Sequence, residues 1–325
     1  ATGHDRMIAP GPKHCRLAVL RDFLFIQNRL RHPGLSKQKD LDPQNVLFGT
    51  LEKNLRYDKK KKQLSFQYQI PKKTCSTMLG GKVPLSVFLS IFDDASTWNL
   101  VCEDRWRRPG VSTHLQAELG PAGLKGRGVN PGDLVDIRTS VVKLGKILGI
   151  AHAEAIDVNS GEVICIGRHT KYMPANFVQN ALLGPLMPLT KWCTSLITKD
   201  DTKVEKELSL DELFQLQNIS ANSRYGRIKV VNGHNNPNET CHGGSQAIMM
   251  EMLGHKAAGA DLIASGNPLL KSISVTYLSP GRGTLDIDVE DIVEDKNATC
   301  LCVKVQSEQG KLVSEGILTF KTNHN

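Results

Sequence analysis

The stretch from Asn236 to Glu251 holds the residues best suited to chemistry, because a polar turn ends in His242-Gly243-Gly244 and continues directly into an apolar run. Glycines at the start of a helix let the backbone approach a ligand closely, and the first N–H groups of a helix have no partner within it. The helix dipole adds a preference for negative charge at this end. The stretch therefore fits a site for a carbonyl oxygen that gains negative charge, and the alternative is an ordinary glycine-rich helix start.

Asp93 is the second candidate for chemistry. It stands in the middle of the apolar run from Pro84 to Leu100, where an unpaired charge is costly. We expect burial to raise the pKa of Asp93, which would make it a usable general base near neutral pH. The alternative is that Asp93 or its neighbour Asp94 simply faces solvent.

The composition limits the class of protein. The 325 residues allow one very large domain or two ordinary ones. No apolar run reaches the roughly 18 residues that a membrane-spanning helix needs, so no integral membrane segment is predicted. The net charge of +8 favours anionic partners such as phosphate-bearing cofactors. Nucleic acid is not predicted, because the three tryptophans form no stacking series, and the eight cysteines contain no CxxC pair that would indicate a metal site.

Residues 1–46 form a basic arm that differs from the rest of the chain. Apolar and basic residues alternate at helical spacing between Cys15 and Arg31. A mitochondrial targeting segment has this character, but so does a peripheral helix that lies on a domain. The arm therefore leaves a mitochondrial or a cytoplasmic location open.

The chain contains an internal repeat. The turn that carries Gly161 and Gly167 recurs at Gly310 and Gly316, with both glycines displaced by the same number of residues. Each half also has one helical apolar run followed by strand-like segments. We expect an α+β fold in which each half wraps an antiparallel sheet around one long helix, and in which the two halves pair as a pseudo-dimer. The expected helices are 84–100 and 242–254, and the expected strands are 111–119, 134–142, 273–278 and 284–289.

Several segments resemble the hotdog-fold acyl-CoA thioesterase family. The resemblance lies in these segments of the two halves: Phe92-Asp-Asp-Ala-Ser-Thr97, Pro109-Gly-Val-Ser112, Val142-Lys-Leu-Gly-Lys146 and Gly167-Arg-His-Thr-Lys171 in the first, and Asn236, His242-Gly243-Gly244, Glu251 and Thr276-Tyr-Leu-Ser-Pro280 in the second. It implies two tandem hotdog domains, 47–174 and 218–325, joined by a linker at 175–217.

The resemblance also implies an active site shared between two hotdog units. One unit would supply Asn236 and the helix start His242-Gly243-Gly244, and the other would supply Asp93 and Ser112. The carboxylate would activate water or attack the carbonyl, and the glycine amides would hold the oxyanion. The asparagine and the serine would position the reactants.

The two halves depart from the family pattern in complementary ways. When Asp93 is aligned with Glu251, the first half has Pro84-Leu85-Ser86 in place of His-Gly-Gly, and Met78 in place of the asparagine. We therefore expect one complete composite site between the halves. The second site, around Glu251, is expected to lack donors and to be inactive.

Basic residues at the end of one strand are candidates for binding the cofactor part of the substrate. The resemblance places Arg168, His169 and Lys171 near the phosphates of coenzyme A, with Lys143 and Lys146 as further candidates. Their donors suit phosphate. The alternative is a solvated sheet edge protected by basic side chains.

The implied activity is hydrolysis of fatty acyl-CoA to free fatty acid and coenzyme A. Coenzyme A would be part of the substrate, and no other cofactor is expected. A non-catalytic acyl-CoA sensor and an enoyl-CoA hydratase of the same fold are the alternatives. Because family units often form tetramers, we expect two of these chains to pair as a homo-oligomer.

Overall fold

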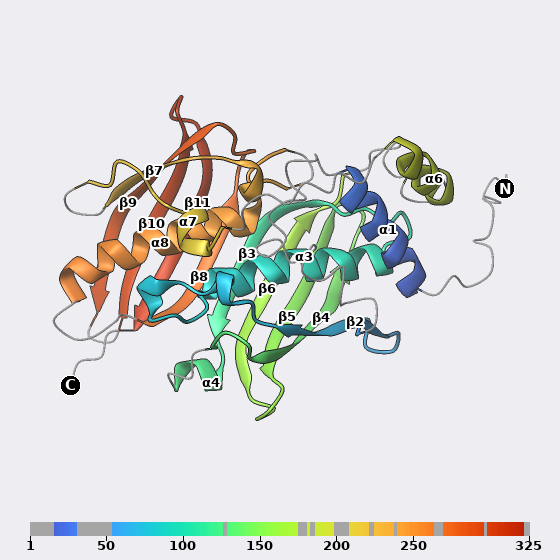
Figure 1. Ribbon diagram of the computed structural model, residues 1–325, viewed down its shortest axis with the longest axis horizontal. Coiled ribbons are helices and arrows are strands. Elements are labelled where there is room, and N and C mark those ends of the chain that lie inside the picture. The colour runs from blue at the N-terminus through green and yellow to red at the C-terminus, as the bar shows by residue number, and fades with distance from the viewer. Residues whose placement is uncertain are drawn as a thin grey trace, which may run out of the picture.

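The computed structural model describes residues 16–30, 54–125, 129–174, 181–182, 186–197, 208–220, 224–236, 239–262, 269–295 and 298–321. Within these residues the chain forms one antiparallel sheet of eleven strands, with two long helices against one face (Figure 1). The predicted α+β architecture of two similar halves is confirmed.

The first half wraps its strands around helix α3 (Leu85–Glu103). The strands are β1 (Arg56–Asp58), β2 (Gln63–Gln69), β3 (Val111–Leu119), β4 (Leu134–Leu144), β5 (Leu148–Asp157) and β6 (Val163–Tyr172). Two 3-10 turns, η2 (Lys72–Thr74) and η3 (Thr77–Leu79), lead into α3, and the short helix α4 (Pro121–Leu124) follows β3.

The second half repeats this plan around helix α8 (Gly243–Leu262), which follows the 3-10 turn η4 (Asn232–His234). Its strands are β7 (Tyr225–Lys229), β8 (Leu269–Tyr277), β9 (Thr284–Asp295), β10 (Ala298–Ser307) and β11 (Leu312–Lys321). Helices α6 (Met187–Ile197) and α7 (Leu210–Leu213) lie in the segment predicted as a linker. The domain boundaries at 47, 174 and 218 stay predictions.

Strands β3 and β8 join the two halves edge to edge. They pair antiparallel, with His114 opposite Thr276 and Glu118 opposite Ser272. The strand order is β1-β2-β4-β5-β6-β3-β8-β11-β10-β9-β7. Each half reaches the junction with its equivalent strand, so the chain has the pseudo-twofold arrangement of a dimer.

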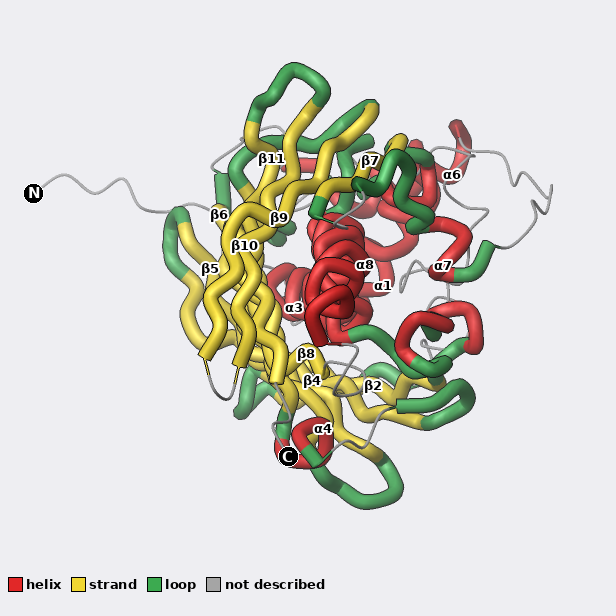
Figure 2. Tube along the Cα trace, turned by 90° about the vertical axis from the view of Figure 1, so that its left-hand side faces the viewer, coloured by secondary structure: helices red, strands yellow, loops and turns green. Residues whose placement is uncertain are grey.

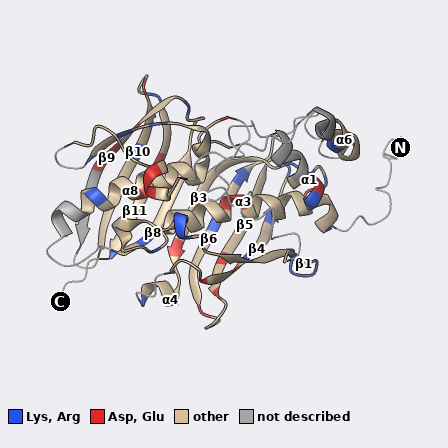
Figure 3. Ribbon diagram, in the orientation of Figure 1, with Lys and Arg blue, Asp and Glu red and all other residues tan. Residues whose placement is uncertain are grey.

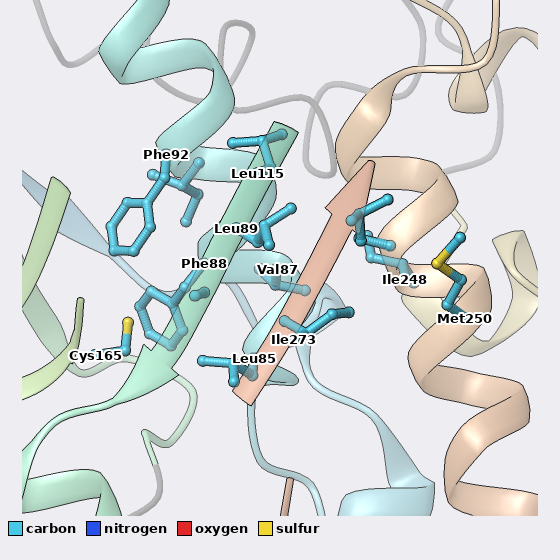
Figure 4. Close-up of a cluster of buried hydrophobic side chains, with 14 of the residues drawn as sticks. Leu85, Val87, Phe88, Leu89, Phe92, Leu115, Cys165, Ile248, Met250 and Ile273 are labelled. Atoms are coloured by element: carbon cyan, nitrogen blue, oxygen red, sulfur yellow. The ribbon is translucent and has the colours of Figure 1, made fainter. Parts of the chain in front are cut away.

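The two central helices are buried on nearly all sides. Every residue of α3 from Leu85 to Cys102 is buried, and Figure 2 shows the sheet curving around α3 and α8. In the core, Leu115 of β3 and Ile273 of β8 lie among side chains of both helices (Figure 4). Charged residues are sparse on α3 and α8 (Figure 3), so a carboxylate in the middle of either helix needs partners.

The repeat in the sequence is preserved in three dimensions. A Cβ on Gly167 of β6 would fall 2.4 Å from the ring of Phe92, and a Cβ on Gly316 of β11 would fall 2.5 Å from the sulfur of Met250. Phe92 and Met250 each immediately precede the central carboxylate of their helix. The repeated glycine therefore lets one strand close over the helix beside that carboxylate in both halves.

Helix α1 (Arg16–Leu30) lies within the basic arm and packs against α3 and α6. Arg16 pairs with Glu103 at the end of α3 and donates a hydrogen bond to the hydroxyl of Tyr57 at 2.6 Å. Its inward side chains are buried: Leu20, Phe23 and Leu24. The structure thus shows a peripheral helix, and the targeting role stays a prediction. In the described part of the chain, no helix has the length and apolar character to cross a bilayer.

Candidate active site

The carboxylate of Asp93 lies at the centre of a buried cluster of donors. Ser112 Oγ donates a hydrogen bond to Asp93 Oδ1 at 2.9 Å, and His169 Nε2 and Lys171 Nζ lie 3.5 and 3.9 Å from the same oxygen. On the other side, His242 Nε2 lies 3.4 Å from Asp93 Oδ2. The cluster is built across both halves, because His242 directly precedes α8 and the other groups belong to the first half.

Ser112 reaches Asp93 because of an irregularity in β3. Leu115 and Ala117 on this strand are buried under the helices, so simple alternation would turn Ser112 to the outer face. The register between β3 and β6 shifts between Ser112 and His114. A bulge adds one residue and changes the direction of the side chains that precede it, so Ser112 points inward.

Both ring nitrogens of His169 lie within hydrogen-bond distance of a serine hydroxyl, and one of these serines, Ser112, bonds to the carboxylate of Asp93. Its Nδ1 lies 2.5 Å from Ser96 Oγ on α3, and its Nε2 lies 3.0 Å from Ser112 Oγ. Because Ser112 gives its only proton to Asp93, we assign the ring proton of His169 to Nε2. Ser96 Oγ, which lies beside Nδ1, donates to the carbonyl oxygen of Phe92 at 2.5 Å. Burial lowers the pKa of His169 to about 3, so the ring is neutral at physiological pH.

The pKa of Asp93 differs from the expectation drawn from the sequence. Burial raises the pKa of Asp93, but His242, His169, Lys171 and the hydroxyl of Ser112 outweigh burial and hold it below the ordinary value. The prediction of a raised pKa is therefore wrong, because it counted burial without the donors that the fold supplies. Asp93 is ionised at neutral pH.

The residues predicted to bind phosphates do not form one cluster. His169 and Lys171 are buried, with exposed fractions of 1% and 5%, and Lys171 Nζ donates a hydrogen bond to Thr97 Oγ1 at 2.7 Å. Arg168 immediately precedes His169 on the strand and is exposed. The three side chains do not share one face, because neighbouring residues of a strand point to opposite faces, and their role in binding coenzyme A stays a prediction.

Lys143 and Lys146 keep exposed side chains, as Arg168 does. Lys143 lies near the end of β4, and Lys146 lies in the turn to β5. The buried Arg108 anchors this turn, since its Nη1 donates to the carbonyl oxygens of Lys146 at 2.6 Å and Met173 at 3.2 Å. The turn is therefore fixed beside the end of β6, and its role in binding coenzyme A stays a prediction.

The start of α8 lies closely against α3. His242 Nδ1 accepts a hydrogen bond from the backbone N–H of Gly244 at 3.1 Å, so its Nε2 carries the proton and faces Asp93. A Cβ on Gly244 would fall 2.2 Å from Ser90 Oγ, and a Cβ on Gly243 would fall 3.0 Å from Asp93 Oδ2. Glycine is therefore required at both positions. The described residues provide no hydrogen-bond partner for the N–H of Gly243.

Asn236 lies in the turn that precedes His242, and Asp94 of α3 lies near the ring of His242. The side chain of Asn236 donates to Thr240 Oγ1 at 2.8 Å, and its backbone N–H donates to the carbonyl of Thr240 at 2.8 Å. Asp94 is buried, with its Oδ1 3.6 Å from His242 Nε2. Asn236 thus shapes the turn that leads to the helix start, and its predicted contact with substrate stays a prediction.

The equivalent position in the second half is arranged differently. Glu251 accepts hydrogen bonds from the backbone N–H of Leu85 at 3.2 Å and of Ser86 at 2.7 Å, both at the start of α3. His255 Nε2 lies 3.4 Å from Glu251 Oε1. We expected donors to be missing here, but two N–H groups are present, and the carboxylate of Glu251 occupies them. Among the described contacts, no such bond joins Asp93 to the helix start that faces it.

The sequence did not lead us to predict three of the side chains that lie around Asp93. Ser96 and Thr97 follow Asp93 at i+3 and i+4, and this helical spacing is a signal that could have found them. Tyr277 ends β8, and its Oη would lie 3.0 Å from a Cβ on Gly243. It belongs to a segment that matched the family pattern, but its position in the sheet was needed to place it here.

Comparisons with known proteins identify the fold. No protein-family model matches the chain, and no curated protein sequence matches it. A candidate oleoyl thioesterase from Lactobacillus plantarum superposes with a TM-score of 0.55 and 11% identity, covering 83% of this chain and 99% of that one. The 12:0-ACP thioesterase from Umbellularia californica gives a TM-score of 0.52 and 11% identity, over 81% and 95% of the two chains.

A third similar structure is described by its fold. It is a protein of unknown function with the hot dog fold from Alicyclobacillus acidocaldarius, with a TM-score of 0.50 and 9% identity over 83% of this chain and 96% of that one. Identities this low show the fold alone. This chain has the hotdog fold, as two hotdog units in tandem.

Proposed function

We propose that this protein hydrolyses acyl-CoA thioesters at one composite site between its two halves. The observation that carries the proposal is the meeting of Asp93 with the His242-Gly243-Gly244 start of α8. An ionised carboxylate thus lies close to a residue whose helix-start N–H has no hydrogen-bond partner among the described residues. A base for water and a donor for an oxyanion are the two groups that thioester hydrolysis needs.

The surroundings of Asp93 fit this reaction. Ser112, His169 and Lys171 all face Oδ1. Oδ2 has His242 Nε2 at 3.4 Å, and its second lone pair can hold a water molecule. The water oxygen forms a bond to the thioester carbonyl carbon while its proton passes to Asp93. The carbonyl oxygen gains negative charge beside the N–H of Gly243. Collapse of this intermediate breaks the C–S bond and releases the carboxylic acid and the thiolate, and the thiolate takes up the proton held by Asp93.

The proposal includes one site rather than two because of Glu251. The N–H groups of Leu85 and Ser86 correspond to those of Gly243 and Gly244, and Glu251 already accepts from both. A substrate carbonyl at this second position would have to displace a carboxylate from its hydrogen bonds. Such bonds to charged groups are worth roughly 1.5–3 kcal/mol each, so the second position stays closed.

Coenzyme A is proposed as the thiol carrier because exposed cations suit its phosphates. Arg168, Lys143 and Lys146 supply such cations, and the net charge of the chain is +8. One structure that shares the fold is an acyl-ACP thioesterase, so acyl carrier protein is the competing thiol carrier.

The test measures free thiol released from acyl-CoA and from acyl-ACP of several chain lengths. We expect Asp93→Asn to lower turnover by roughly 10²- to 10⁴-fold, and Glu251→Gln to retain most of it. Equal losses in the two variants would overturn the single composite site. If the wild-type protein releases no thiol from any thioester, hydrolysis is ruled out, and retained binding of acyl-CoA would then favour a sensor.

A further inference from the structure

Tyr277 carries a buried hydroxyl group that the packing of the protein does not explain. Its ring packs against the core at the end of β8, and its Oη is buried with no hydrogen-bond partner among the described residues. An unpaired hydroxyl in the interior costs free energy. A phenylalanine would fill the same space without this cost, so the hydroxyl needs another reason.

The position of Tyr277 supplies a reason. A Cβ added to Gly243 would fall 2.9 Å from Cζ and 3.0 Å from Oη of Tyr277, and also 3.0 Å from Asp93 Oδ2. The phenol and the carboxylate therefore approach the same side of Gly243, too closely to leave room for a side chain at this residue. Gly243 is also the first residue of α8, and its N–H has no hydrogen-bond partner among the described residues.

The phenol keeps its proton in this place. Burial raises the pKa of Tyr277 well above its usual value, and the nearby Asp93 and Cys241 raise it further. A protonated phenol beside an ionised carboxylate can donate a hydrogen bond throughout the physiological pH range. The two groups are thus suited to different partners, since Asp93 accepts and Tyr277 donates.

We propose that the Tyr277 hydroxyl is a catalytic donor, which binds the carbonyl oxygen of the thioester together with the N–H of Gly243. This inference rests on the proposed function. As the water oxygen bonds to the carbonyl carbon, an electron pair moves onto the carbonyl oxygen, and Tyr277 stabilises that charge by a hydrogen bond while keeping its proton. When the C–S bond breaks, the pair returns and the hydrogen bond weakens. The donor therefore acts mainly in the transition state.

The test is Tyr277→Phe, assayed for kcat, KM and Tm. Loss of one oxyanion donor is expected to lower kcat by roughly 10²- to 10³-fold with little change in KM. Because the variant removes an unpaired buried hydroxyl, its Tm is expected to equal or exceed that of the wild-type protein. A residue with a purely structural role would not show a loss of kcat together with a maintained Tm.

Tyr225→Phe is the matched control. Tyr225 Oη donates to Asp286 at 2.6 Å on the outer strands, so this variant should lose some stability and keep its kcat. If Tyr277→Phe retains the wild-type kcat, or changes only KM, the role of Tyr277 is overturned and thioester hydrolysis still stands. If the wild-type protein itself turns over no thioester, the proposed function is overturned, which separates the two failures.

Discussion

Glu251 Oε2 accepts a hydrogen bond from the backbone N–H of Ser86 at 2.7 Å, across the boundary between the two halves. Ser86 occupies in the first half the place that Gly244 occupies in the second, and Glu251 occupies the place of Asp93. The start of one central helix thus meets the middle of the other twice in the molecule, once closed by a carboxylate and once open. The carboxylate at the closed contact belongs to a glutamate, which is one methylene group longer than the aspartate at the open contact.

The closed contact is expected to contribute to stability. Glu251→Gln replaces a charged acceptor of two backbone N–H groups by a neutral one, and we expect it to lower the free energy of unfolding by about 1–3 kcal/mol. Urea denaturation measures this loss. The exposed Glu308 is the matched control, and Glu308→Gln should stay within about 0.5 kcal/mol of the wild-type protein. Equal effects of the two substitutions would contradict a stabilising role for Glu251.

The pH dependence of turnover is expected to depend on Lys171. The donors around Asp93 lower its pKa, so the carboxylate stays ionised as the pH falls to about 4, the ordinary value. We therefore expect that protonation of Asp93 does not lower kcat/KM until the pH falls to about that value. Lys171→Met removes a buried positive charge 3.9 Å from Asp93 Oδ1, which raises the pKa of Asp93 and moves the acid limb of the profile toward neutral pH.

Lys143→Met is the control for this pH profile, because Lys143 is exposed. It should leave the acid limb in place. If Lys143 contacts the phosphates of coenzyme A, the variant should raise KM for acyl-CoA. An acid limb that does not move in Lys171→Met would show that Lys171 does not set the pKa of Asp93.

His234 is expected to make the fold sensitive to acid. Its Nε2 donates to the carbonyl of Leu213 at 2.9 Å, and its Nδ1 accepts from the N–H of Val231 at 3.1 Å, so the ring is held neutral. Burial lowers the pKa of His234 to about 4. The unfolded chain takes up a proton below about pH 6.5 and the folded chain does not, so stability falls as the pH drops from about 6.5 to about 4.

The expected loss from this residue is about 3 kcal/mol over that range of pH. Urea denaturation at a series of pH values measures it. His234→Gln should be less stable at neutral pH but should show a shallower decline on acidification. The exposed His152 provides the control, since His152→Gln should keep the wild-type slope. A decline of equal slope in His234→Gln would contradict this origin of acid sensitivity.

The repeated glycines are expected to tolerate alanine unequally. A Cβ on Gly167 meets the rigid ring of Phe92 at 2.4 Å, whereas a Cβ on Gly316 meets the sulfur of Met250, at the flexible end of a side chain, at 2.5 Å. We expect Gly167→Ala to lower the free energy of unfolding by about 1–3 kcal/mol, and Gly316→Ala to lower it less because methionine can repack. Chemical denaturation of both variants tests this. Equal or reversed losses would contradict it.

The sequence by itself determined the order of elements and the repeat. Hydrophobic periodicity and the spacing of glycines are local properties, so the strand expected at 111–119 coincides with β3, and the helices expected at 84–100 and 242–254 correspond to α3 and α8. Comparison of the halves also paired Asp93 with Glu251. These inferences need only the chain and its internal alignment.

Only the tertiary structure decided which groups face Asp93. The bulge in β3 turned Ser112 inward, and the direction of β6 side chains put His169 and Lys171 inside and Arg168 outside. The pKa of Asp93 fell because these donors outweigh burial, although burial was the only effect visible in the apolar sequence around it. Hydrogen bonds and charge interactions act between atoms far apart in the chain, so their partners are set by strand register and by the pairing of the two halves.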